Sequence, residues 1–248
     1  MNFLKSKHAW LAAPLLWVAG IIVLVTIWAI TTPEWIDAHF NNDGVSPVES
    51  ATIGFFWLQI FFFWLMPPMR KSGQRAFWLA DFSLLSFFAI CRQLDWHKLL
   101  ISAEIAPGGT TGTPFKMRFL TNPNNPLADR LIVLACFIVV LGLFGGTLLY
   151  FLRRLIAGLF KLHPVCWSIG FFGGALVLIQ FADRLPAVLR KKCGIEISEN
   201  IKAFSTALEE GQEVLLPLFV ILAVIQAYFI YNNDPDTDTS HLARFREI

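Results

Sequence analysis

Six long apolar segments constrain the fold of this chain more than any other feature of its sequence. A helix that crosses a bilayer needs about 20 mostly apolar residues, and hydrocarbon leaves its backbone no hydrogen-bond partners outside the helix. The segments that meet or approach this length cover residues 10–30, 50–66, 77–91, 131–152, 165–182 and 214–231. The pattern predicts an all-α fold, a polytopic membrane helical bundle with six transmembrane helices.

The composition agrees with this class of protein. Of the 248 residues, 56% are hydrophobic and 15% are charged, whereas soluble domains carry about 25% charged residues. The net charge of +2 is too small to indicate a nucleic-acid partner. Because apolar segments and their connections take up nearly the whole chain, we expect one transmembrane domain over residues 1–232. Residues 233–248 are polar and are expected to form a flexible cytoplasmic tail.

The distribution of Lys and Arg predicts the orientation. The short connections carry basic residues with few acids, whereas the long connections mix Lys and Arg with many Asp and Glu. Short basic loops stay in the cytoplasm, so both termini are predicted to be cytoplasmic. The first apolar segment lacks a good cleavage site and is expected to be retained. The predicted location is the inner (plasma) membrane of a bacterium, with the long connections in the periplasm.

Two of the long connections have features of their own. Residues Ile197, Ile201, Phe204 and Leu208 recur at helical spacing, and Ser198 is suited to cap a helix start. They predict a short interfacial amphipathic helix before the last span. The connection over residues 99–130 is rich in Gly, Pro, Thr and Asn, which indicates irregular backbone. A loop of that length is usually functional, and we expect it to cover the outer end of the bundle.

Charged residues recur at one end of the predicted bundle. They begin the second and sixth spans and end the third and fifth, notably in the run CRQLDWHKLL. An ionisable group near hydrocarbon costs roughly 3 kcal/mol unless it is paired or faces a wet cavity, so these side chains are expected to converge. The predicted ligand-binding residues are Glu49, Arg92, Asp95, His97, Lys98, Asp183, Arg184, Glu209, Glu210 and Glu213.

The residue types in this set favour a charged pocket at the periplasmic end. Arg92 and Arg184 would hold an anion, and Asp95, Glu210 and Glu213 would tune the charge or act as acid and base if a reaction follows. The leading hypothesis is a protein that binds or processes an amphiphilic or anionic small molecule, such as a lipid headgroup. Membrane lipids are therefore the expected partners.

Other interpretations stay open at this stage. Charges at span ends often meet headgroup water without a specific role. Interior pairing can also be a clasp between helices, in which case the protein is a non-catalytic scaffold or subunit of a larger membrane assembly with a protein partner. A small transporter is the third alternative, because the ends of two predicted hairpins, RQLD and ADRL, are weakly similar.

The sequence predicts no cofactor. Haem held by two histidines needs them inside spans, and none of the five histidines falls there. The chain has no HExxH or CxxC spacing for zinc. Oxygen ligands for a divalent cation exist at the charged end, so such a site stays an alternative without a linear motif.

Asp81 lies inside the third apolar segment, near its cytoplasmic start. Arg75 precedes it by less than two helical turns. A structural pair between them is favoured over a proton relay, because no second acid lies at that depth.

Overall fold

The computed structural model describes residues 3–6, 8–40, 46–66, 72–94 and 117–231, and these residues form helices without any strand. Six helices are long, and their bounds are α1 (Ala12–Ile30), α3 (Pro47–Leu65), α4 (Ser72–Gln93), α7 (Leu127–Phe160), α8 (Pro164–Cys193) and α9 (Glu199–Tyr231). The shorter helices are η1 (Phe3–Lys5), η2 (Ala9–Leu11), α2 (Pro33–Phe40) and α6 (Met117–Thr121). The predicted tail and most of the predicted cover over residues 99–130 lie outside the described residues.

Five helices in the described part of the chain are long and apolar enough to cross a membrane. They are Ala9–Ile30, Pro47–Leu65, Leu127–Phe160, Pro164–Arg190 and Glu199–Ile230. The all-helical, multi-span character of the prediction is confirmed, but the count of six spans is not. Helix α4 has 22 residues, which makes it about 33 Å long, yet it is more polar than the other five because it contains residues such as Asp81 and Arg92.

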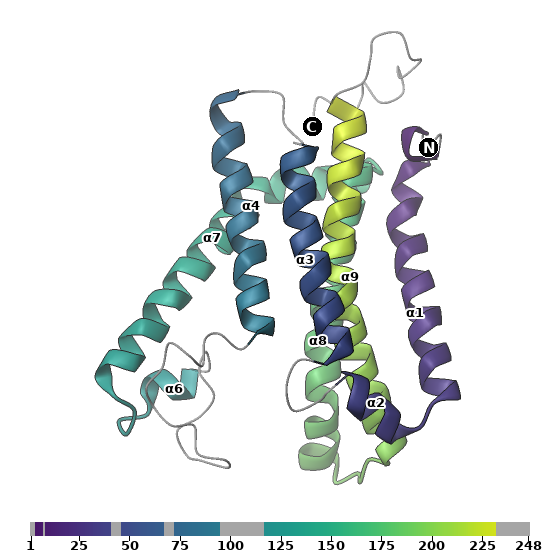
Figure 1. Cartoon of the computed structure of the whole chain (residues 1–248), viewed down its shortest axis with the longest axis vertical. Coiled ribbons are helices and arrows are strands. Elements are labelled where there is room, and N and C mark those ends of the chain that lie inside the picture. The colour runs from purple at the N-terminus through teal and green to yellow at the C-terminus, as the bar shows by residue number, and fades with distance from the viewer. Residues whose placement is uncertain (1–2, 7, 41–45, 67–71, 95–116, 232–248) are drawn as a thin grey trace.

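The long helices pass back and forth along one axis (Figure 1). Helices α1, α3, α4 and α9 run side by side along the bundle, and α8 lies against α9. Gln226 Nε2 donates a hydrogen bond to the carbonyl oxygen of Ala9 over 3.0 Å. This bond places η2, which leads into α1, beside the last turns of α9. The first and the last long helix therefore have their outer chain ends on the same side of the bundle.

Helix α9 forms the centre of the bundle. In its most apolar stretch 67% of the residues are buried, against 6% for α7. Small residues let α1 approach it closely: a Cβ atom at Gly211 would lie 2.2 Å from Leu24 Cδ2, and one at Gly20 would lie 2.6 Å from Leu215 Cδ1. Small residues at helix contacts are typical of membrane bundles, where close backbone approach replaces the hydrophobic driving force.

The predicted interfacial helix before the last span is not confirmed as a separate element. The segment containing Ile201 and Phe204 is the first part of α9, which runs without a break for 33 residues. Part of its apolar side packs against other helices. Trp28 of α1 lies 5.0 Å from the Phe204 ring and donates a hydrogen bond to the Asn200 carbonyl, whereas Ile201 is 48% exposed. Because these contacts hold the segment in the bundle, the helix continues straight into the last span.

Helix α7 leans away from the other helices in Figure 1. It is joined to α4 by a hydrogen bond, which the Thr147 hydroxyl donates to the buried Asp81 carboxylate over 2.6 Å. Trp78 of α4 also stacks near Tyr150 and Phe151, with ring centroids 4.9 Å apart in both pairs. Asp81 therefore joins two helices, and the Arg75 side chain that was expected to pair with it lies outside the described residues.

Candidate functional site

Glu213 is the centre of the charged end of the bundle. Its side chain is only 4% exposed, and Arg92 Nη2 donates to its Oε1 atom over 2.9 Å. Gln93 Nε2 donates to the other carboxylate oxygen. Arg92 and Gln93 occupy the last turn of α4, so both bonds join α4 to α9. The structure thus brings Arg92 and Glu213, which are far apart in the sequence, into direct contact.

Arg92 is oriented differently from its partner. Its side chain is 66% exposed although one of its nitrogens is bonded to the buried Glu213 carboxylate. A guanidinium has five N–H donors in a fixed plane. The end of α4 is also a favourable place for a cation, because helix carbonyls there carry partial negative charge. The remaining donors of Arg92 are therefore directed outward from the bundle.

Two further carboxylates, Glu209 and Glu210, lie on α9 within electrostatic reach of Glu213. Asp183 of α8 repels Glu209, Glu49 of α3 repels Glu210, and Arg92 attracts both. We call Glu49, Arg92, Asp183, Glu209, Glu210 and Glu213 the charged cluster. The cluster contains five carboxyl groups and one guanidinium, so acidic groups outnumber basic groups in its described part.

Glu49 also has a structural role that its sequence position allowed but did not establish. Its backbone N–H donates to Ser46 Oγ over 3.1 Å, and its Oε2 accepts from the Ser46 backbone N–H over 2.6 Å. This reciprocal pair is a capping box, which starts α3 with Pro47 in its first position. One of its carboxylate oxygens is therefore already bonded within the chain.

The candidates for acid–base chemistry differ in their surroundings. Both oxygens of Glu213 accept hydrogen bonds, so neither is placed to take a proton from a ligand. Glu210 Oε2 is buried and has no hydrogen-bond partner among the described residues. Of the three predicted candidates, Glu210 is thus the one with an unused oxygen, and Asp95 lies outside the described residues.

Sequence reasoning missed two glutamines at this end. Gln93 bonds directly to Glu213, and Gln212 is completely buried, with its Oε1 accepting from Trp17 Nε1 over 3.0 Å. The signal was present in the sequence, because amides at these positions follow or precede charged residues inside apolar segments. Neutral side chains were not considered, although they satisfy buried carboxylates without adding charge.

The remaining predicted residues are not brought into the charged cluster by any contact in the described chain. Arg184 is exposed on α8 and forms no ion pair with a described residue. His97 and Lys98 lie outside the described residues, as Asp95 does. Among the residues that are described, no three His, Cys, Asp or Glu side chains are placed to hold a metal ion.

The fold and the charged cluster together define a class: an all-helical protein with several helices of membrane-spanning character and an acidic cluster at one end. No protein-family model matches the chain, and neither a curated protein nor a solved structure shows significant similarity to it. A functional assignment therefore depends on the chemistry of the cluster itself.

Proposed function

We propose that this protein binds the headgroup of a membrane amphiphile at the charged cluster, and that the headgroup carries both a phosphate and an amine. In the predicted orientation the protein lies in a bacterial inner membrane, and the cluster faces the periplasm. One observation carries the proposal: several carboxyl groups lie near Arg92, whose side chain is 66% exposed.

The phosphate would bind to Arg92. Arginine recognises phosphate through parallel N–H donors, and such charge-assisted bonds are about twice as strong as neutral ones. The bond to Glu213 fixes the guanidinium at the end of α4. Because most of the side chain is exposed, its other donors are available to a ligand.

The amine would bind to Glu209 and Glu210. The cluster holds five carboxyl groups and one guanidinium, so its composition favours a headgroup with its own cation over a simple anion. Glu210 Oε2 is buried and has no hydrogen-bond partner among the described residues, so it would accept a hydrogen bond from an ammonium group that enters the cluster. An aminophospholipid satisfies both requirements, because its phosphate and amine are separated by only a short linker.

The test is the affinity of the purified protein for a soluble short-chain phosphatidylethanolamine, measured by titration calorimetry. Glu210→Gln removes the charge and keeps the shape, and we expect binding to weaken about tenfold, the effect of losing one charge-assisted hydrogen bond. Glu199→Gln is the matched control, because Glu199 is on the same helix, its side chain is 79% exposed, and within the described chain it forms an ion pair with Lys202 alone. Equal affinities for Glu210→Gln and the unmodified protein would contradict the proposal, as would tighter binding of phosphatidylglycerol, which has no amine.

A second candidate function, a scaffold in a membrane assembly, is favoured by a different observation. Both oxygens of Glu213 are used inside the chain to join α4 to α9, which is what a helix clasp requires. The exposed apolar length of α7 would then contact a partner protein. Co-purification of a stoichiometric partner from mild detergent, together with normal behaviour of Glu210→Gln, would favour this function over headgroup binding.

A further inference from the structure

We infer that a groove between α1 and α8 binds one acyl chain of a phospholipid, whose phosphate lies at Arg184. The inference goes beyond the proposed function, because the groove shares no residue with the charged cluster. It is a second lipid site on another side of the bundle, formed by α1, α8 and the end of α7.

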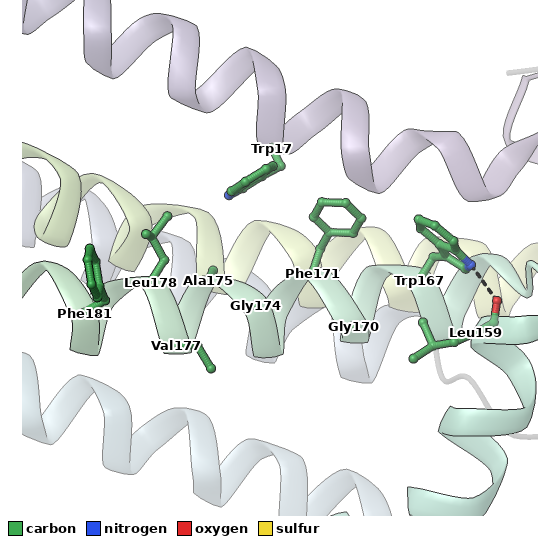
Figure 2. Close-up of a pocket in the computed structure, with 10 residues that line it drawn as sticks. All are labelled: Trp17, Leu159, Trp167, Gly170, Phe171, Gly174, Ala175, Val177, Leu178 and Phe181. Atoms are coloured by element: carbon green, nitrogen blue, oxygen red, sulfur yellow. Dashed lines mark hydrogen bonds between the residues drawn. The ribbon is translucent and has the colours of Figure 1, made fainter.

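The groove has a volume of about 590 Å³ and is lined by apolar side chains and glycines (Figure 2). Trp17 of α1 contacts Phe171 of α8, with ring centroids 5.7 Å apart, and both rings belong to its wall. Gly170 and Gly174 leave part of the wall without side chains. Such a wall gives water few hydrogen-bond partners, whereas hydrocarbon matches it. The chemistry of the lining therefore selects an alkyl chain.

The length of the groove matches one extended chain. Its lining follows α8 from Trp167 to Phe181, a distance of about 21 Å at 1.5 Å per residue. One leaflet of hydrocarbon is about 15 Å deep, so the groove is long enough to hold a whole chain straight. Leu159 of α7 lies at one end, where its carbonyl accepts a hydrogen bond from Trp167 Nε1 over 3.0 Å (Figure 2).

The size of the groove suits a small ligand. Its volume of about 590 Å³ lies inside the range of small-ligand sites, about 300–1,000 Å³. The groove therefore has room for one acyl chain.

Arg184 supplies the charge that such a ligand needs. It follows Phe181 by three residues and Val177 by seven, so it extends the same face of α8 beyond the open end of the groove. Its side chain is exposed, and it makes no ion pair within the described chain. A chain lying in the groove would therefore bring a lipid phosphate to an arginine with unused donors.

The experiment uses the full chain in nanodiscs that contain a phosphatidylglycerol with a diazirine near the end of one acyl chain. After illumination, mass spectrometry maps the labelled peptides. We expect labelling on α1 and α8 around Trp17 and Phe171. Filling the groove with Gly174→Leu should reduce that labelling about tenfold.

Gly173→Leu is the matched control. A Cβ atom at either glycine meets no other atom within 4 Å, so both positions accept a larger side chain, but only Gly174 lines the groove. Val177→Trp, at a groove position that is 70% exposed, is a second filling variant that does not depend on a glycine. Arg184→Gln should weaken labelling by the phospholipid but not by a photoreactive alkane, which has no phosphate.

Three outcomes would overturn the inference. Equal labelling in Gly173→Leu and Gly174→Leu, or labelling spread evenly along α7, would mean bulk lipid contact only. Cross-links to a second copy of the chain at the groove would identify a protein occupant instead. Arg92→Gln separates this site from the proposed headgroup site: it should leave groove labelling unchanged while weakening aminophospholipid binding.

Discussion

The ion pair between Arg92 and Glu213 makes an asymmetric prediction about stability. The Glu213 side chain is 4% exposed, whereas the Arg92 side chain is 66% exposed. Removing the acid leaves a guanidinium that water can solvate, so Glu213→Gln should cost about 1 kcal/mol, the upper value for an exposed ion pair. Removing the base leaves a buried carboxylate beside two others, and Arg92→Gln should cost about 2–3 kcal/mol, the penalty for an unsatisfied buried charge.

The assay is equilibrium unfolding of both single variants and of the double variant in the same detergent. The structure predicts that Arg92→Gln is the more destabilising substitution. It also predicts that the double variant loses less than the two single losses added together, because the carboxylate charge is gone with its partner. A Glu213→Gln loss equal to or larger than that of Arg92→Gln would refute the burial asymmetry. Strict additivity would refute the contact itself.

Two helix contacts give further predictions, each with a matched control. Gly211→Leu should strongly lower the thermal unfolding midpoint, because a Cβ atom there would lie 2.2 Å from Leu24. Gly146→Leu is the control and should change the midpoint little, because a Cβ atom there meets nothing within 4 Å. Equal midpoints for the two variants would contradict the packing of α1 on α9. Thr147→Val removes the hydrogen bond to Asp81 and should cost about 0.6–1.7 kcal/mol in unfolding, with faster hydrogen exchange in α7. Thr26→Val is the control, since its hydroxyl bonds only within its own helix, and equal effects of the two threonine variants would contradict the α4–α7 contact.

Hydropathy predicted most of the fold because the bilayer leaves few options. A run of about 20 apolar residues is long enough to cross a bilayer and has to be helical there, so the positions of α1, α3, α7, α8 and α9 followed from the sequence. The sequence did not predict that α9 begins as early as Glu199. Residues such as Phe204 have the same spacing in an interfacial helix, whose apolar side meets lipid, and in a longer α9, whose apolar side meets α1. Only the contact with Trp28 decides between these.

The candidate site was predictable in part for a similar reason. Charges beside hydrocarbon must find partners, and Arg92 and Glu213 did so across 121 positions of sequence. The direction in which each side chain leaves its helix was not predictable from the sequence. Arg184 is exposed on α8 and forms no ion pair with the described residues of the cluster. Gln93 and Gln212 were missed because an amide inside an apolar segment has no net charge to draw attention to it.

A cryo-electron microscopy map of the protein in nanodiscs rich in phosphatidylethanolamine would test headgroup binding most directly. We predict headgroup density that contacts the outer face of Arg92 and the free oxygen of Glu210, with Glu213 bonded to both residues at the end of α4. A map in which Arg92 points away from Glu213, and in which only disordered lipid surrounds Glu210, would contradict the account.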